Sequence, residues 1–442
     1  MVDATQSVDF TIEARWIVPV EPHGVVLEGY AVVVDGERIV AVLPVEQARQ
    51  RYAPRERVVL GEHVLIPGLV NAHVHNPMTL MRGLADDVPL MRWLKEFIWP
   101  AEAKVLGPEF VRDGIELAIA EMLRGGTTCC NENYFYPDVQ ATTYRRHGFR
   151  ARVGLPIIEF PTPWASSTDE YFDKALAVHD DLRGDSLIGT AFAPHAPYSV
   201  SDASFERIRL YCDQLDLPVH LHLHETADEI ADSVRDHGMR PFARIKQLGL
   251  VNNQLIAVHM TQLTEGEIAD CAAHGVSVVH NVESNLKLVS GFCPAAALRR
   301  AGVNLAIGTD GCASNNDLDL FGEMRTAALV GKMVANDAAA LDAPTVLRAA
   351  TLGSARALGW GESIGSIEIG KQADLAAVRL DDLETQPIYN VISQLIYVAG
   401  RHQVSDVWIA GRRKLRGRVL SDIDTTELLV RTQRWRERIA AA

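Results

Sequence analysis

Short apolar runs alternate with amphipathic segments over the middle of the chain, from about residue 67 to residue 370. The runs predict buried strands, and segments with apolar positions three or four residues apart predict helices. Such alternation is typical of a parallel sheet with crossover helices. Eight units favour a closed (β/α)8 TIM barrel over an open doubly wound sheet. The predicted strands lie at residues 64–73, 127–131, 152–158, 188–193, 219–223, 255–259, 276–280 and 304–307.

One intervening segment shows clear helix boundaries. Residues 108–124 begin with Pro108 and Glu109, keep apolar residues on one face, and are followed by Gly125 and Gly126. Proline is favoured in the first turn of a helix and glycine just after its end. The pattern therefore predicts a helix over residues 108–124.

The two ends of the chain are patterned as short strands and turns. Residues 31–34 and 39–42 flank an Asp35-Gly36 turn signal, and residues 373–378 and 404–409 repeat this style. We therefore expect a small β-sandwich domain formed from both chain ends. The expected division is residues 1–66 for its first part, 67–370 for a metal-dependent barrel, and 371–442 for its second part with a C-terminal helix.

Histidines gather where the predicted strands end. Eight of the fifteen histidines lie within or beside the carboxyl halves of these strands, and Glu225 and Asp310 lie beside them. Barrel enzymes build their active sites at this end of the strands, so these side chains are expected to form one site. The eight are His73, His75, His195, His220, His222, His224, His259 and His280.

The His73-Val74-His75 sequence places two imidazoles on one face of a strand, because side chains alternate along a strand. A third histidine and an aspartate from other strands would complete a zinc site. Nitrogen and oxygen donors without a thiolate suit Zn²⁺, while Fe²⁺, Mn²⁺ and Co²⁺ stay open. Spacing alone does not choose among His220, His222 and His224 on the fifth strand.

Composition narrows the class of partner. The net charge is −14, and no run of lysine and arginine appears, so nucleic-acid and anionic-membrane binding are disfavoured. No apolar run approaches the ~20 residues of a membrane span, and the first residues lack a signal-peptide pattern. Six scattered cysteines without a CxxC pair indicate buried, reduced thiols. We expect a cytoplasmic enzyme with a small-molecule substrate. The sequence leaves open whether it forms a homo-oligomer.

Four segments carry a resemblance to a known family. Residues 66–75, IPGLVNAHVH, look like the first-strand signature of the amidohydrolase superfamily. Residues 222–225, 280–288 and 308–316 read HLHE, HNVESNLKL and GTDGCASNN. Together they resemble the 5′-methylthioadenosine/S-adenosylhomocysteine deaminases, in a group that includes chlorohydrolases and guanine deaminase. The resemblance covers nearly the whole chain, both β-rich ends included.

The resemblance implies zinc-dependent hydrolytic deamination of an adenine nucleoside to its inosine analogue and ammonia. Its implied metal ligands are His73, His75, His222 and Asp310. Two-metal members carry a carboxylated lysine at the end of the fourth strand, and residues 188–204 contain no lysine, so one Zn²⁺ per chain is expected.

Catalytic roles follow from the same resemblance. Glu225 would move a proton from water to N1 of the adenine ring, and Asp310 would take the remaining proton. His259 would orient the water and stabilise charge at the attacked carbon. Glu225 and Asp310 thereby also count as substrate contacts.

The resemblance also implies substrate contacts in the long first loop. Glu102, in the sequence Trp-Pro-Ala-Glu, would hold the ribose 2′ and 3′ hydroxyls, and His195 would contact the nucleoside. Trp93, with Phe97, Ile98 and Trp99, would line an apolar pocket for a methylthio group, although an amphipathic helix face gives the same pattern.

The 5′ substituent is expected to be neutral. Residues 159–173 contain no arginine to grip a homocysteine carboxylate, and the direction of Arg150 and Arg152 is left open. Methylthioadenosine is therefore expected to be preferred over S-adenosylhomocysteine.

Two alternatives remain. The enzyme could be an aminohydrolase or chlorohydrolase acting on a free ring such as guanine, a pterin or a triazine, since the metal ligands would be nearly the same. A metal-free scaffold protein is disfavoured because all four implied ligands and Glu225 are present.

Overall fold

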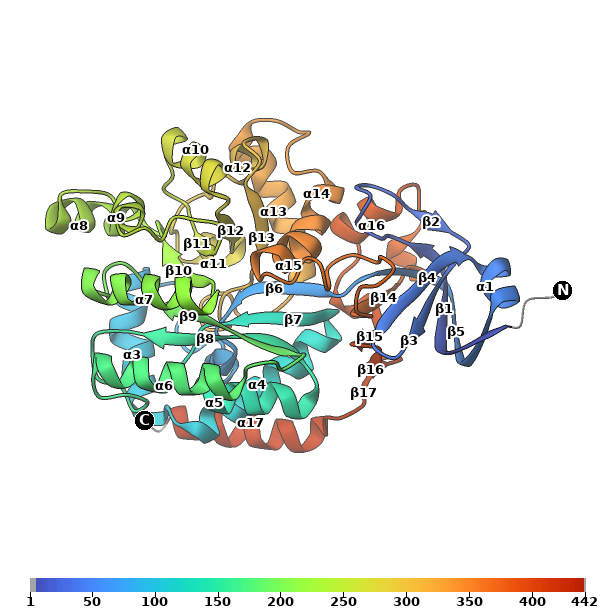
Figure 1. Cartoon of the computed structure of the whole chain (residues 1–442), viewed down its shortest axis with the longest axis horizontal. Helices are drawn as coiled ribbons and strands as arrows, with labels where there is room; N and C mark the ends of the chain where they lie inside the picture. The colour runs from blue at the N-terminus through green and yellow to red at the C-terminus, as the bar shows by residue number, and fades with distance from the viewer. Residues whose placement is uncertain (1–4, 441–442) are drawn as a thin grey trace.

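Two sheets organise residues 5–440, the part of the chain that this computed structural model describes. One is an eight-stranded parallel sheet that curls into a nearly closed barrel, and the other is a nine-stranded mixed sheet (Figure 1). The two sheets lie side by side along the long axis of the molecule.

The barrel strands pair in chain order, each parallel to the next. Asn71, in the first strand, closes the ring against Thr309, just after the last. The Asn71 side-chain amide donates to Thr309 Oγ1 at 2.8 Å, and the Thr309 N–H donates to Asn71 Oδ1 at 3.0 Å. The strands are β6 (Leu69–Val74), β7 (Thr127–Glu132), β8 (Arg150–Ile157), β9 (Ile188–Pro194), β10 (Val219–Leu223), β11 (Leu255–His259), β12 (Ser277–His280) and β13 (Asn304–Ile307).

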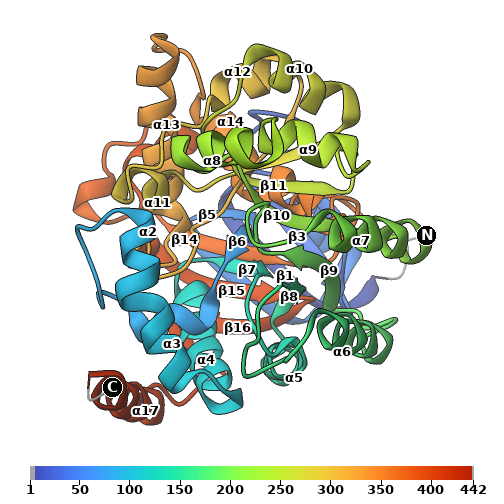
Figure 2. The ribbon, with the colours of Figure 1, turned by 90° about the vertical axis from the view of Figure 1, so that its left-hand side faces the viewer.

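Helices surround the barrel strands (Figure 2). The predicted helix over residues 108–124 is confirmed as α4 (Pro108–Arg124), with Pro108 in its first turn and Gly125 at its C-cap. The other long helices after successive strands are α5 (Pro137–His147), α6 (Thr168–Asp181), α7 (Asp202–Leu215), α8 (Ala227–His237), α10 (Glu265–His274) and α13 (Leu320–Ala335). Shorter ones are α9 (Pro241–Gln247), α11 (Val282–Lys287), α12 (Ala295–Arg300), α14 (Ala343–Arg348) and α15 (Ser354–Ala357).

The predicted barrel strands are confirmed, with one difference at the first. The run predicted over residues 64–73 is divided between β5 (Tyr52–Pro67) of the mixed sheet and β6 of the barrel. Gly68 lies at the division, where its N–H donates to the Asp374 carbonyl at 2.9 Å. A Cβ at this position would lie 2.1 Å from Thr128 Oγ1, so a side chain has no room here. The whole run is buried, and its hydrophobicity therefore gives no sign of the boundary.

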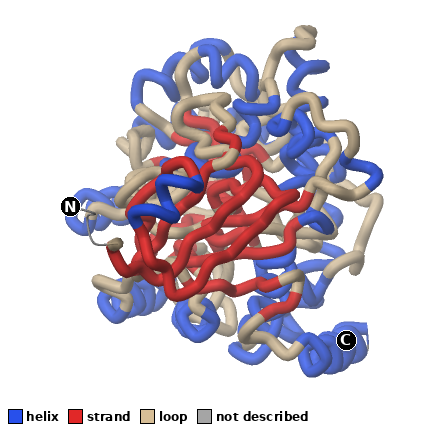
Figure 3. The backbone as a smooth tube through the Cα atoms, turned by 90° about the vertical axis from the view of Figure 1, so that its right-hand side faces the viewer, coloured by secondary structure: helices blue, strands red, loops and turns tan. Residues whose placement is uncertain are grey.

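The mixed sheet, which faces the viewer in Figure 3, comes from both ends of the chain, as predicted. β5 joins them: it lies parallel to β1 (Gln6–Ile17) and antiparallel to β14 (Leu375–Arg379). Ile12, Val34 and Trp408 share a buried core on this sheet. Its remaining strands are β2 (Leu27–Glu28), β3 (Tyr30–Asp35), β4 (Arg38–Pro44), β15 (Val404–Ile409), β16 (Arg412–Arg416) and β17 (Val419–Leu420).

The helix at the C-terminal end, α17 (Thr425–Ala440), packs against α4 of the barrel. Trp435 of α17 is buried and donates its indole N–H to Asp113 Oδ2 of α4 at 2.8 Å. All six cysteines are buried and free, as the sequence indicated. No helix within residues 5–440 combines the length and apolar character needed to cross a bilayer.

Candidate metal centre and active site

The polar residues predicted to form a site converge at the carboxyl ends of the barrel strands. His73 lies in β6, His222 in β10 and His259 at the end of β11, while His75 and Asp310 follow β6 and β13. His73, His222, His259 and Asp310 are buried, and His75 is half-buried. The barrel thus brings together residues that are more than two hundred positions apart in the chain.

The four implied metal ligands point at one another. Asp310 Oδ1 lies 3.3 Å from His73 Nε2 and 3.2 Å from His75 Nε2. His222 Nε2 lies 3.4 Å from His75 Nε2. The ring nitrogens of His73, His222 and His259 also lie within 4.8 Å of one another. His73 belongs both to this group and to the group that it forms with His75 and Asp310, so three imidazole nitrogens and one carboxylate oxygen line one small space.

Each of these rings is held through its other nitrogen. His73 Nδ1 lies 2.8 Å from His220 Nε2, and His75 Nδ1 donates to the Asn133 carbonyl at 2.5 Å. His222 Nδ1 donates to the His195 carbonyl at 2.7 Å. Bonds of this kind fix the tautomer, leaving the Nε2 lone pairs free for a cation.

Electrostatics favour the ligand forms of these groups. Burial lowers the pKa of His73 to about 4 and that of His222 well below its ordinary value, so both imidazoles are neutral at pH 7. Burial would raise the pKa of Asp310, but His73 and His75 hold it well below its usual range. Burial would lower the pKa of His75, yet Asp310 raises it, and a bound cation would take the place of that proton.

The donor set fits Zn²⁺. His73 Nε2 is buried and has no hydrogen-bond partner of good geometry among residues 5–440, which is costly unless a cation satisfies it. Three nitrogens and one oxygen are ligands that Zn²⁺ accepts, and a catalytic zinc keeps a further position for water or substrate.

His259 and Glu225 face each other across the same space. His259 Nε2 lies 3.8 Å from Glu225 Oε2, and His259 Nδ1 is 2.8 Å from Asn285 Oδ1. Ser290 Oγ donates to Glu225 Oε1 at 3.3 Å. Burial raises the pKa of the Glu225 carboxyl, and the charge of Asp310 adds to this effect. A carboxyl group with a raised pKa in such a position is chemically suited to proton transfer.

A cavity of about 420 Å³ opens directly above this cluster. Its wall includes His75, His222, Glu225, His259 and Asp310. Most of the remaining lining is apolar and comes from the long loop after β6 and from the loops after β7 and β8. This part includes Met78, Trp93, Ile98, Trp99, Phe135, Ile158 and Phe160.

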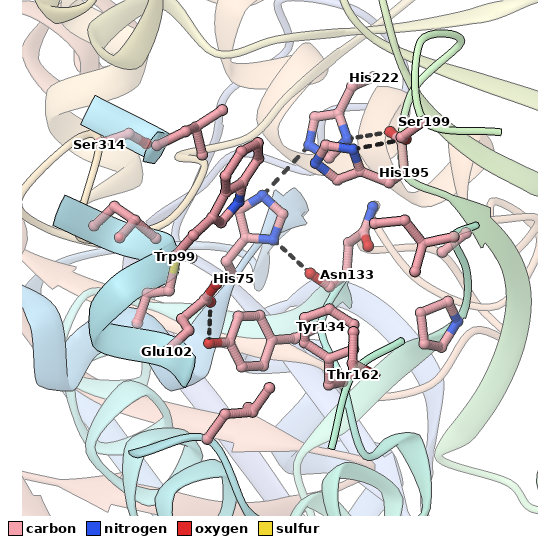
Figure 4. Close-up of a pocket in the computed structure, with 18 of the residues that line it drawn as sticks. His75, Trp99, Glu102, Asn133, Tyr134, Thr162, His195, Ser199, His222 and Ser314 are labelled. Atoms are coloured by element: carbon pink, nitrogen blue, oxygen red, sulfur yellow. Dashed lines mark hydrogen bonds between the residues drawn. The ribbon is translucent and has the colours of Figure 1, made fainter. Parts of the chain in front are cut away.

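The predicted substrate-binding residues Trp93, Glu102 and His195 all line this cavity. Tyr134 donates its hydroxyl to Glu102 Oε1, and Figure 4 shows the two side chains pointing toward each other. Burial raises the pKa of Glu102 to about 7, although the Tyr134 hydrogen bond opposes this effect. Phe97, in contrast, packs against the hydrophobic core rather than lining the cavity.

The structure also gives the direction of Arg150 and Arg152. Arg150 Nε lies 2.8 Å from Asp374 Oδ2, and Arg152 donates to the carbonyls of Thr190 and Leu358 at 2.5 and 2.6 Å. Neither guanidinium lines the cavity, and no lysine or arginine is found among the described residues that do.

Some functional residues were missed by sequence reasoning. Asn285, Tyr134 and Ser290 hold His259, Glu102 and Glu225. Asn285 lies in the segment 280–288 that carried the resemblance, which was a signal for its role. Of the two other histidines on the fifth strand, His220 contacts the His73 ring at 2.8 Å, whereas His224 Nε2 accepts from the Phe242 N–H at the start of α9.

Comparison with known proteins identifies the family. The sequence profile described as the Amidohydrolase family matches residues 64–414. The chain is 47% identical over 437 residues to the 5-methylthioadenosine/S-adenosylhomocysteine deaminase of Teredinibacter turnerae, covering 99% of each chain. It is 35% identical to the 5′-deoxyadenosine deaminase of Methanopyrus kandleri, covering 96% of this chain and 98% of that one.

Solved structures agree with this result. A crystal structure of an adenosine deaminase from Xanthomonas campestris with bound zinc has a TM-score of 0.99 and 66% identity, covering 99% of this chain and 100% of that one. The atrazine chlorohydrolase TrzN from Arthrobacter aurescens, with zinc, has a TM-score of 0.90 at 23% identity, covering 96% and 99%, and shares the fold. By the match of its profile and its nearly full-length relatives, this chain belongs to the amidohydrolase family.

Proposed function

We propose that this protein is a zinc-dependent aminohydrolase that converts an adenine nucleoside into its inosine analogue and ammonia. The observation that carries the proposal is that His73, His75, His222 and Asp310 are linked by short contacts beneath a cavity also lined by Glu225 and Glu102. The names of the relatives support it, because they describe deaminases of methylthioadenosine, S-adenosylhomocysteine, 5′-deoxyadenosine and adenosine.

One Zn²⁺ would be held by His73, His75, His222 and Asp310. When bound, it lowers the pKa of a water molecule to roughly 7 and so supplies a nucleophile at neutral pH. Homo-oligomer formation stays a prediction.

Proton transfer is the work of Glu225, Asp310 and His259. Glu225 takes a proton from the attacking water and delivers it to N1 of the adenine ring, which prevents negative charge from building on the ring. Its raised pKa makes the carboxylate a stronger base toward the attacking water. Asp310 takes the remaining proton and passes it to the departing ammonia. His259, held by Asn285, orients the nucleophile and stabilises charge at the attacked carbon.

The nucleoside is bound by the loop side of the cavity. Glu102 accepts hydrogen bonds from the ribose 2′ and 3′ hydroxyls, for which a carboxylate is a natural bidentate acceptor. Trp93 contacts the apolar part of the substrate, and His195 contacts the nucleoside from the opposite wall.

The 5′ substituent is proposed to be neutral, as in methylthioadenosine. An apolar lining favours a methylthio group, whereas the carboxylate of S-adenosylhomocysteine would need a cationic partner or water. Arg150 and Arg152 are engaged elsewhere.

The test is incubation of the zinc-loaded protein with adenosine, methylthioadenosine, S-adenosylhomocysteine and free adenine. Ammonia release and loss of the adenine absorbance are the readouts. We expect turnover of the nucleosides, with the highest kcat/KM for methylthioadenosine, and none of adenine. If no adenine compound is deaminated, the proposal is wrong, and guanine, pterins and triazines become the substrates to examine.

A further inference from the structure

The peptide backbone at His224 and Glu225 is held from one side by a single carboxylate. Glu229 lies in the first turn of α8 and is almost fully buried. Its Oε1 accepts the His224 N–H at 3.1 Å, and its Oε2 accepts the Glu225 N–H at 2.7 Å. The two oxygens of one side chain therefore fix two consecutive N–H groups.

Thr261 holds the same two residues from the other side. This residue follows β11 and is buried. Its N–H donates to the His224 carbonyl at 2.9 Å. The shortest contact of its hydroxyl is with the Glu225 carbonyl, at 2.7 Å. Every backbone hydrogen-bonding group of His224 and Glu225 is thus engaged by Glu229 or Thr261.

The backbone at this point is strained without such support. His224 has a φ of 54°, in the left-handed region that residues other than glycine rarely adopt. Conformations of this kind persist where surrounding bonds over-determine them, and they are frequent at active sites. Glu225, the residue that follows this turn, lines the cavity.

The carboxyl group of Glu225 has few contacts of its own. Ser290 Oγ is 3.3 Å from Oε1, and His259 Nε2 is 3.8 Å from Oε2, so both are long for hydrogen bonds. The position of the carboxyl group is therefore set mainly through its backbone.

We propose that Glu229 and Thr261 are positioning residues that hold the Glu225 carboxyl group in place for proton transfer, an inference that rests on the proposed function. Neither residue lies against the implied metal ligands or takes part in the chemistry. They act on the reaction through the backbone of Glu225.

Helix capping alone does not explain Glu229. In the neighbouring helix α10, Glu267 forms an ordinary capping box, in which its carboxylate accepts the N–H of the N-cap residue Thr264 at 2.8 Å. In α8 the N-cap residue is Thr226, yet the Glu229 carboxylate reaches the two residues that precede it. The Glu229 carboxylate therefore accepts the N–H groups of His224 and Glu225 instead of the N–H group of its N-cap residue.

The test compares Thr261→Val, Thr261→Ser and Glu229→Gln with wild type and with the control Thr264→Val. The control makes the same change three residues away and removes a cap hydroxyl that does not contact Glu225. Zinc content, melting temperature, kcat and KM for the best nucleoside substrate are measured for each variant.

We expect Thr261→Val to lower kcat by at least about 10-fold with KM and zinc content nearly unchanged. A misplaced proton carrier reduces the stabilisation of the transition state without weakening substrate binding. Thr261→Ser keeps the hydroxyl and should restore most of kcat. Glu229→Gln should also lower kcat, because its amide NH₂ would face an N–H group. Thr264→Val should lower only the melting temperature.

Equal kcat values in wild type, Thr261→Val and Glu229→Gln would overturn the inference while leaving the proposed function intact. So would a Thr261→Ser variant as slow as Thr261→Val, since that result would mean a loss of packing rather than of the hydroxyl. No deamination by the wild type would overturn the proposed function, and the inference with it.

Discussion

At the scale of single residues, the metal site depends on how each imidazole is held. The Nδ1 atoms of His73, His75 and His222 are each engaged in a hydrogen bond, which leaves their Nε2 atoms facing the site. Two of those partners are backbone carbonyls, which any residue type could supply, so the sequence could not reveal them. His220 is a side-chain partner, and it is therefore open to mutation.

Replacing His220 with alanine should weaken zinc binding about 10- to 100-fold, because His73 would lose the bond that fixes its tautomer and orientation. Zinc affinity is measured by competition with a chromophoric chelator. His179→Ala is a matched control, since His179 bonds Thr190 outside the site. An unchanged zinc affinity in His220→Ala would show that this contact does not orient the ligand.

Glu102 should make substrate binding depend on pH near neutrality. Burial raises its pKa to about 7, and only the carboxylate form accepts both ribose hydroxyls. As the pH falls below 7, the Glu102 carboxylate becomes protonated. KM for adenosine should therefore be higher at pH 6 than at pH 8. KM for 2′,3′-dideoxyadenosine, measured alongside, should not follow the same curve. Parallel curves for the two substrates would argue against a role of Glu102 in diol binding.

At the scale of elements, most strands and the helix α4 could be predicted because their apolar patterns are regular. The boundary between β5 and β6 could not, since the run is buried throughout and only close packing at Gly68 sets the division. The packing of α17 on α4 could not be predicted from the hydrophobic pattern either. It depends on Arg431 and Trp435 meeting Asp113 and Glu116.

Arg431→Met should destabilise the protein by about 1–3 kcal/mol, because it removes the cation that the buried Asp113 and Glu116 carboxylates share, leaving Arg112 beside Asp113 and His147 beside Glu116. The exposed neighbour Arg434 provides the control Arg434→Met, which should leave stability unchanged. Denaturant unfolding at pH 7 measures both. Equal stability of the two variants would mean that the ion pairs are not needed to dock α17.

The same contacts predict a pH dependence of stability. Burial would raise the pKa of Glu116, but His147 and Arg431 lower it to about 2, below the value of about 4.5 in an unfolded chain. A depressed pKa stabilises the folded state above pH 4.5, and this contribution is lost as pH falls toward 2. Wild type should therefore lose more stability than Glu116→Gln between pH 4.5 and pH 3, measured on metal-free protein.

At the scale of the whole molecule, the barrel assembles the site from strand ends that are far apart in the chain. The family signature located the implied ligands and Glu225, because these residue types are required by the chemistry. It did not indicate Glu229 or Thr261, whose proposed roles come from geometry, and it included Asn285 in the segment 280–288 without indicating its contact with His259. The apolar cavity, without a cation in its described lining, agrees with the expectation from the arginine-free segment 159–173.

The most direct test of the central claim is a zinc titration of the metal-free protein while deamination of methylthioadenosine is followed. Activity should be absent without metal, rise linearly with added Zn²⁺, and stop rising at one equivalent per chain. Full activity in the metal-free protein, or no product at any zinc ratio, would contradict a zinc-dependent nucleoside deaminase.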